Sequence, residues 1–328
     1  MQGLVSIIIP TFNREDLIGE TLDSVLDQIH TNWECIVVDD GSQDSTLQVL
    51  QRYAQNDDRF KIYERPAHMP KGANSCRNFG YEQSKGAFVN WFDSDDVLHP
   101  DFMEQKVKAF TDETIHATFH RNRYASFDLT IARESRFHPN SFKDFLFYFG
   151  TDQTEISING LMWRRSFLEG KPLYNEHLSR YQDNEFNIRM LGHGPKIADT
   201  QQVLATVRVG GTHSTQISYR PSRSAKKLFD IVYYRYQSFL QQNKVSVALQ
   251  KEYTNVVTKK FFWNLYEALS MLHTRRERWE AMKQRKDMVD DVLQNGHLSP
   301  WHRWKMKASI YIKAILFKQS YSSIGQKK

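Results

Sequence analysis

Three stretches within the first hundred residues share one pattern: an apolar run typical of a buried strand, then polar turn-forming residues, then apolar residues at helical spacing. They cover residues 4–26, 33–50 and 87–110. Consecutive strand-turn-helix units of this kind form a parallel sheet whose loops gather along one edge. Open α/β sheets bind their ligands at the carboxyl ends of such strands. The sequence therefore predicts an α/β fold with its functional site at that edge.

The third strand ends in an acidic cluster, in which Asp93, Asp95 and Asp96 are interrupted only by Ser94. Carboxylates this close repel one another, and each raises its neighbour's pKa unless a cation neutralises the group. Hard carboxylate oxygens select Mg²⁺ or Mn²⁺, which complete their shells with water and substrate phosphates. The alternative is turn chemistry, with Asp95 or Asp96 capping the helix after Pro100. The cluster alone leaves both interpretations open.

Four segments together resemble the family 2 glycosyltransferases of the A-type nucleotide-sugar fold. They read SIIIPTFNR, VVDDGSQDST, KGANSCRNFGYEQSKGAFVNWFDSDD and, more weakly, YQDNEFNIRML, and they span roughly residues 4–215 in family order. The resemblance implies a Rossmann-like, mostly parallel sheet flanked by helices. It also implies transfer of a sugar from a nucleoside diphosphate sugar, with UDP-sugar the expected donor, and inversion at the anomeric carbon. The expected acceptor is a saccharide or lipid-linked saccharide in surface polysaccharide synthesis.

The resemblance places the nucleoside of the donor at the ends of the first two strands. Thr11 and Asp39 match the positions that contact the base and ribose, and the expected donor contacts extend to Pro10, Asn13 and Asp40. An aspartate can accept hydrogen bonds from a uracil N–H or from ribose hydroxyls. The alternative for the Asp39 segment is an ordinary turn with a helix N-cap.

A basic element precedes the third strand and matches the family's Gly-x-x-x-Ala-Arg-Asn pattern, except that Cys76 stands where alanine is usual. Arg77 is expected to lie against the base or the diphosphate, where a planar, permanently charged group is useful. Lys71 is a second candidate partner for phosphate. A solvated basic turn at a helix start is the alternative for both residues.

The acidic cluster receives its roles from the same resemblance. Asp93, with Ser94 beside it, is expected near the ribose, and Asp95 is expected on a Mn²⁺ or Mg²⁺ ion. Asp96 is either a second metal ligand or a structural cap. His213 is a candidate metal or phosphate contact, although it lies later than the usual family spacing, and an exposed loop histidine is the alternative.

The general base is expected in a later helix-opening motif. The family's Glu-Asp pair is represented by Gln182 and Asp183, so the assignment falls on Asp183. The helix dipole favours the anion and would weaken it as a base unless burial opposes the effect. Glu185 can instead pair with Arg189 one helical turn later. Trp163 could stack on an acceptor sugar, but an aromatic residue in a strand is more often part of the core.

Composition limits the remaining possibilities. The 328 residues carry 44 basic and 38 acidic side chains, and a net charge of +6 is too small to indicate nucleic-acid binding. Two cysteines make no disulfide framework and fit a reducing compartment. No apolar run approaches the ~20 residues of a membrane span, and no signal-peptide pattern follows Met1. These observations predict a cytoplasmic protein, either free or resting on the inner face of the cell membrane.

The chain is expected to divide into a nucleotide-sugar-binding half at 1–110, an acceptor-binding half of the same domain at 111–218 and a helical region at 219–328. Near its end, one helical face is apolar and basic residues cluster beside it (apolar Trp301, Trp304, Ala308, Ile312 and Ile315; basic Arg303, Lys307 and Lys318). The pattern fits a helix lying on an anionic membrane, and equally a helix packed on the catalytic domain. Lys305 interrupts the apolar face.

A second class of function stays open from the sequence. Because Gln182 replaces one acid of the family motif, the chain could be a non-catalytic partner of another glycosyltransferase that binds glycan or nucleotide. Release of UDP from a UDP-sugar would distinguish the two. The oligomeric state, the donor sugar and the linkage are not predicted.

Overall fold

A computed structural model describes most of the chain. The described residues are 3–126, 128–130, 132–138, 141, 145–150, 153–178, 182–209, 258, 265, 269, 272, 274–284, 286–295 and 299–316. The chain separates into two compact units, Met1–Tyr219 and Arg220–Lys328, and each is described here by itself.

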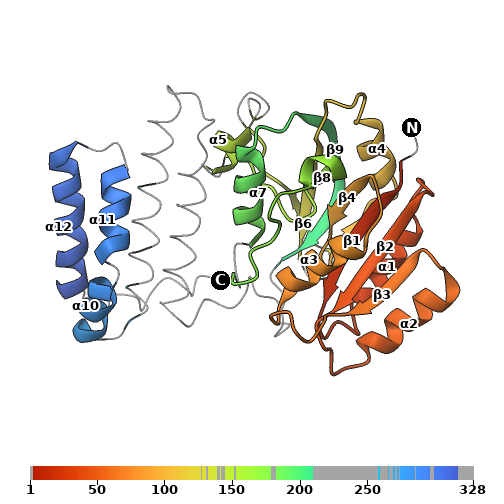
Figure 1. The fold of residues 1–328 in the computed structure, drawn as a ribbon, viewed down its shortest axis with the longest axis horizontal. Coiled ribbons are helices and arrows are strands. Elements are labelled where there is room, and N and C mark those ends of the chain that lie inside the picture. Colours follow the sequence, from red (N-terminus) through yellow and green to blue (C-terminus); the bar gives the residue numbers. More distant parts are fainter. Residues whose placement is uncertain are drawn as a thin grey trace. The chain divides into compact units, whose positions relative to one another are not determined.

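The first unit begins with four parallel strands (Figure 1). They are β1 (Val5–Thr11), β2 (Trp33–Asp39), β3 (Phe60–Glu64) and β4 (Phe88–Trp91), in the spatial order β3-β2-β1-β4. Every residue of β1, β2 and β4 is buried, which explains why their sequences are apolar runs rather than alternating patterns. Thr11 pairs with Asp39, so β1 and β2 end side by side. The two polar turns therefore share one edge.

The sheet continues with strands of mixed direction. β8 (Leu161–Arg164) runs antiparallel to β4 and to β6 (Ala117–Ala125), and β9 (Ile197–Arg208) runs parallel to β6. The short strands β5 (Val97–Leu98) and β7 (Ala132–Glu134) pair antiparallel with β9 and β6. The expected α/β fold is confirmed, and its parallel pairing is concentrated in the first half.

Helices flank this sheet (Figure 1). They are α1 (Ile18–Leu26), α2 (Thr46–Asn56), α3 (Ala73–Gln83), α4 (Phe102–Lys108), α5 (Phe145–Gly150), α6 (Arg165–Leu168) and α7 (Gln182–Gly192). α3 packs on β1 and β2, and α4 packs on β6 and β9. A Cβ atom on Gly80 of α3 would lie 2.5 Å from a methyl of Ile8, so the glycine allows α3 to lie close to β1.

A buried lysine links the two halves of the sheet. Lys106 of α4 is fully buried, and its Nζ donates to Asn90 Oδ1 at 3.1 Å and to the carbonyls of Asn159 and Gly160 at 3.1 and 3.2 Å. Removal from water lowers the pKa of Lys106 well below its usual value. These bonds tie the strand that leads to Asp93 to the loop before β8.

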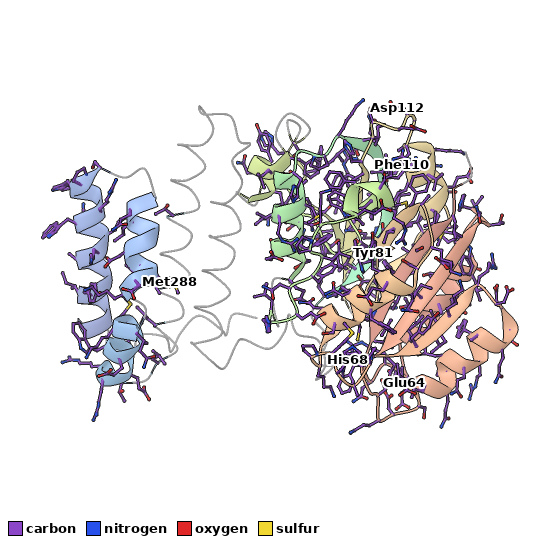
Figure 2. All side chains as sticks on the ribbon, viewed as in Figure 1. Glu64, His68, Tyr81, Phe110, Asp112 and Met288 are labelled. Atoms are coloured by element: carbon purple, nitrogen blue, oxygen red, sulfur yellow. The ribbon has the colours of Figure 1, made fainter. Side chains whose placement is uncertain are left out.

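The described part of the second unit contains α10 (Arg275–Gln284), α11 (Lys286–Asn295) and α12 (Pro300–Leu316), which contact one another (Figures 1 and 2). Met288 marks α11 in Figure 2 and is buried. Among the described residues, no helix is both long enough and apolar enough to cross a membrane.

Candidate active site

The predicted edge is formed by the residues that follow β1, β2 and β4. The backbone N–H of Asp40 donates to the carbonyl of Thr11 at 2.9 Å, and that of Phe92 donates to the carbonyl of Ile8 at 2.9 Å. These bonds continue the strand pairing to the last residue before the acidic cluster. The sheet therefore brings Thr11, Asp39 and the cluster to one edge.

Asp39 is held by its own turn. Its Oδ2 accepts hydrogen bonds from the backbone N–H groups of Gly41 and Ser42 at 2.9 and 2.8 Å, and the Ser42 hydroxyl donates to Oδ1. The alternative of an ordinary turn is thus realised. The same bonds hold the buried carboxylate in one orientation, and its contact with the donor stays a prediction.

Asn13 is a structural link between the first two turns. It has φ of 50°, a left-handed conformation that asparagine tolerates well. Its N–H donates to Ser42 Oγ at 2.9 Å, and its Oδ1 accepts from the N–H of Gln43 at 2.9 Å. Pro10 is an internal, buried residue of β1. Both residues therefore have structural roles at this edge, and their contacts with the donor stay predictions.

Thr11 presents an unused polar group. The residue is buried, and among the described residues its Oγ1 has no hydrogen-bond partner. A buried hydroxyl without a partner carries a free-energy cost, which a ligand can relieve. Thr11 is therefore the residue of this edge whose geometry most directly points to a bound molecule.

Asp40 and Lys71 have partners that the sequence did not reveal. Asp40 forms an ion pair with Arg65, whose guanidinium also donates to the carbonyls of Pro66 and Met69. This arginine folds the loop after β3 against the edge. The ammonium of Lys71 lies 4.3 Å from the centre of the Phe12 ring. Both predicted contacts with the donor stay predictions.

Arg77 and Asp93 form the first charged pair of the site. The Arg77 Nη2 lies 2.8 Å from Asp93 Oδ1, and Nη1 donates to Asn74 Oδ1 at 3.1 Å. The arginine side chain is only 4% exposed, whereas that of Asp93 is 40% exposed. Arg77 is thus not a solvated surface charge. Its buried guanidinium holds the partly exposed carboxylate of Asp93.

Asp95 and Asp96 differ in their surroundings. Asp95 Oδ2 lies 3.3 Å from Arg14 Nη2, whereas Asp96 Oδ1 accepts the backbone N–H of Arg208 at 3.0 Å. The Arg208 guanidinium donates to the Asp95 carbonyl. Burial, together with the charges of Asp95 and Asp93, raises the pKa of Asp96 well above its usual value. Of the two roles open to Asp96, this geometry favours the structural one; Ser94 beside it is also buried.

Asp183 lies in the first turn of α7, and its Oδ1 accepts the N–H of Asn184 at 2.9 Å. Burial raises the pKa of Asp183 and the charge of Asp93 adds to the effect, while the Asn184 bond and Arg77 oppose it. Burial therefore outweighs the hydrogen bond at the helix start, which answers the question left open by the sequence. A carboxylate with a raised pKa is a better proton acceptor.

Of the two polar neighbours of Asp183, Glu185 has an ion-pair partner and the side-chain oxygen of Gln182 has none among the described residues. Glu185 forms an ion pair with Arg189 at 2.8 Å, which confirms the helix salt bridge. The Arg189 guanidinium also donates to the carbonyls of Pro172 and Leu173. Gln182 Oε1 is buried and has no partner among the described residues.

An asparagine clamp joins α3 to the loop that leads to α7. Asn78 Nδ2 donates to the carbonyl of Tyr174 at 2.9 Å and to Glu176 Oε1 at 3.0 Å, and Asn78 Oδ1 accepts the N–H of Tyr174 at 2.9 Å. Asn74 donates to the carbonyls of Asn175 and Leu178 at 2.7 and 2.9 Å. Sequence reasoning missed this clamp, although both residues belong to the element that contains Arg77.

Two further expectations concern the acceptor side and the metal. Trp163 is buried and stacks on Phe167 with ring centres 5.4 Å apart, so it belongs to the core rather than to a sugar platform. His213 lies outside the described residues.

The chemistry of the acidic cluster fits a hard divalent cation. Asp95 and the exposed Asp93 offer carboxylate oxygens, and Mg²⁺ or Mn²⁺ commonly takes one or two carboxylates together with substrate phosphates. Within the described ranges, no group of three or more histidine, cysteine or acidic side chains could hold a metal by itself. A cation here would therefore depend on oxygens of the donor.

Comparisons with known proteins identify the class. The profile of Glycosyl transferase family 2 matches residues 6–170. EpsH of Bacillus subtilis strain 168, whose name describes a glycosyltransferase, is 28% identical over 264 residues, which are 76% of this chain and 72% of EpsH. TuaG of the same strain, named for teichuronic acid biosynthesis, is 37% identical over 116 residues, which are 35% of this chain and 45% of TuaG.

Solved structures share the fold. TarS 1–349 of S. aureus has a TM-score of 0.68 at 17% identity, covering 95% of this chain and 90% of that one. The mannosyltransferase PcManGT of Pyrobaculum calidifontis has a TM-score of 0.54 at 17% identity, covering 96% and 86%. The fold is thus that of nucleotide-sugar glycosyltransferases of the A type. The chain belongs to glycosyl transferase family 2.

Proposed function

We propose that this protein is a metal-dependent, inverting glycosyltransferase that moves a sugar from a UDP-sugar to a saccharide or lipid-linked saccharide in surface polysaccharide synthesis. The observation that carries the proposal is the edge at which Thr11, Asp39 and the Arg77–Asp93 pair meet, with Asp183 electrostatically coupled to that pair. Binding groups for a nucleotide and a group suited to accept a proton thereby belong to one site.

The donor nucleoside is assigned to the first two strand ends. The unpartnered Thr11 hydroxyl and the fixed carboxylate of Asp39 supply hydrogen-bonding groups for the base and ribose. Asp93, which pairs with Arg77 and whose side chain is 40% exposed, is assigned to the ribose hydroxyls. Lys71 is exposed, and its ammonium group is assigned to the diphosphate.

The metal is assigned to Asp95, with Asp93 as the second available carboxylate. When bound, Mn²⁺ or Mg²⁺ supplies positive charge that stabilises the departing diphosphate. Arg14 and Arg208 hold the Asp95 side chain and backbone, and so keep that carboxylate in place. Asp96 accepts a hydrogen bond from the Arg208 backbone and is assigned a structural role in the cluster.

Asp183 is assigned the role of general base. An acceptor hydroxyl forms the new bond to the anomeric carbon, its proton passes to the Asp183 carboxylate, and the bond from that carbon to the diphosphate oxygen breaks with the electron pair leaving on oxygen. Attack opposite the leaving group inverts the anomeric carbon. The raised pKa of Asp183 suits it to hold this proton.

The similar proteins support this choice of substrates. TarS has been solved with UDP-GlcNAc and PcManGT with GDP-Man and Mn²⁺. TuaG is named for teichuronic acid biosynthesis, and another relative is named as a glucosyltransferase acting on an undecaprenol-linked saccharide. The second candidate, a non-catalytic glycan-binding or nucleotide-binding partner, is favoured only by Gln182 in place of an acid.

The test compares the wild type with Asp183→Asn and Asp95→Ala. A panel of nucleotide sugars with Mn²⁺ is screened by thermal shift, because a ligand that binds the folded state raises the melting temperature. Release of UDP from the best donor is then measured with a mixture of saccharide acceptors. Asp183→Asn should keep donor affinity and lose turnover by about 10²-fold or more. Asp95→Ala should lose the metal-dependent part of the shift.

Two outcomes would contradict the assignments. Near-normal turnover of Asp183→Asn would remove Asp183 from the role of base. A wild type that binds UDP but releases none from any donor would favour the non-catalytic alternative.

A further inference from the structure

The outer face of α12 is apolar and exposed. Trp301, Trp304 and Ile312 are 59%, 69% and 53% exposed, and their spacing along a helix places them on one face. The opposite side of α12 faces α10 and α11, as shown by the contacts among these helices and by the ion pair of Lys307 with Asp290. These three side chains are therefore accessible on the outer face of α12, and packing of this face on the catalytic domain stays a prediction.

A third tryptophan extends the apolar surface onto α10. Trp279 is partly exposed, and its ring meets that of Tyr311 edge-on with centres 5.9 Å apart. We call the surface formed by Trp279, Trp301, Trp304 and Ile312 the tryptophan face. Isolated exposed apolar residues are ordinary, but several large ones side by side mark an interaction surface.

A basic side chain lies on this surface. The sequence of α12 contains no acidic residue, and of its basic residues Lys307 is paired with Asp290 of α11. Lys305 is exposed on the tryptophan face itself, with its ammonium 4.9 Å from the centre of the Trp301 ring. Tryptophan and lysine together on one helical face are typical of helices that lie in the headgroup region of a bilayer.

We propose that the tryptophan face docks on the surface of a membrane that contains anionic phospholipid. The indole rings and Ile312 enter the interfacial region, and the Lys305 ammonium meets the lipid phosphates. A second copy of this chain fits the surface less well, because a symmetric contact would bring the two Lys305 side chains toward each other, and α12 contains no acidic residue to pair with them. The inference concerns the second unit and does not depend on the identity of the donor or of the catalytic base.

The test uses the full-length protein and sedimentation with vesicles of equimolar phosphatidylglycerol and phosphatidylcholine, which contain no glycolipid. The wild type should sediment with these vesicles and bind vesicles of phosphatidylcholine alone at least about tenfold more weakly. The double variant Trp301→Ser, Trp304→Ser should lose at least about tenfold in partitioning. Lys305→Glu should lose about fivefold or more in partitioning onto the anionic vesicles. Added salt should weaken the binding of this variant less than that of the wild type.

Ile29→Ser is the matched control. Ile29 is 57% exposed and follows α1 in the first unit, so its change removes an exposed apolar side chain outside the tryptophan face. It should bind vesicles like the wild type. A far-ultraviolet circular dichroism spectrum and a cooperative thermal unfolding transition like those of the wild type show that each variant is folded.

Three results would overturn the proposal. They are failure of the folded wild type to bind the anionic vesicles, undiminished binding by the double tryptophan variant, and a concentration-dependent dimer in analytical ultracentrifugation that the same variant abolishes. The last result would assign the tryptophan face to a second copy instead.

Discussion

The asparagine clamp predicts how a residue remote from the reacting atoms controls Asp183. Asn78 makes three hydrogen bonds to the segment that precedes α7, two of them to the backbone of Tyr174. The Tyr174 ring in turn stacks on Phe186 of α7 with centres 4.4 Å apart. Loosening Tyr174 should therefore loosen the helix whose first turn holds Asp183.

The magnitude for Asn78→Ala follows from these bonds. Each partly buried hydrogen bond contributes about 1 kcal/mol to stability, so three give about 3 kcal/mol. Alanine gains about 0.6 kcal/mol of helix propensity at this position inside α3, and water restores part of the lost bonding. The expected net loss is about 2 kcal/mol. In a unit of 219 residues this lowers the melting temperature by about 4–8 °C.

The assay combines thermal unfolding, donor binding and release of UDP. Asn78→Ala should keep donor affinity within about twofold and lose turnover more strongly, since small errors in the position of a catalytic group are costly. Asn78→Asp keeps the acceptor for the Tyr174 N–H, but it turns both donated bonds into contacts between oxygens, one of them with the Glu176 carboxylate. Its melting temperature should therefore not exceed that of Asn78→Ala.

Asn56→Ala is the control, because Asn56 is exposed at the end of α2. It should change stability by less than about 0.5 kcal/mol. If Asn78→Ala has the same melting temperature as Asn56→Ala and keeps full turnover, the clamp does not support α7 and the reasoning fails.

Two further predictions concern buried polar groups. Because burial lowers the pKa of Lys106, the unfolded chain binds more protons than the folded one between the two pKa values, and the wild type should gain stability as the pH rises toward about 10. Lys106→Met should lose this gain in urea unfolding; an unchanged slope with pH would contradict it. Gln182→Glu places a second carboxylate beside Asp183, so it should raise the Asp183 pKa and move the acid limb of the kcat/KM profile to higher pH. A profile identical to that of the wild type would show that residue 182 does not act on the base.

The local pattern of the sequence was enough to predict the edge of the sheet. Apolar runs followed by turn residues specify buried parallel strands, and such strands necessarily bring Thr11, Asp39 and Asp93 together. The spacing of Glu185 and Arg189 was likewise sufficient, since residues four apart on a helix are neighbours.

The partners of the charged groups were decided by the tertiary structure alone. Arg14 lies 81 positions before Asp95, and Arg208 lies 112 positions after Asp96, so no local pattern relates them. The direction of the Asp183 pKa shift likewise depends on burial, which opposes the local hydrogen bond at the helix start.

The sequence by itself determined the strand ends, the helix faces and the residue types available at the site, because these follow from interactions between near neighbours in the chain. Only the tertiary structure decided that Trp163 is core and that Asn78 clamps the loop before α7. Burial and hydrogen bonding between distant segments depend on which elements the fold brings into contact, and that information is not contained in any single segment.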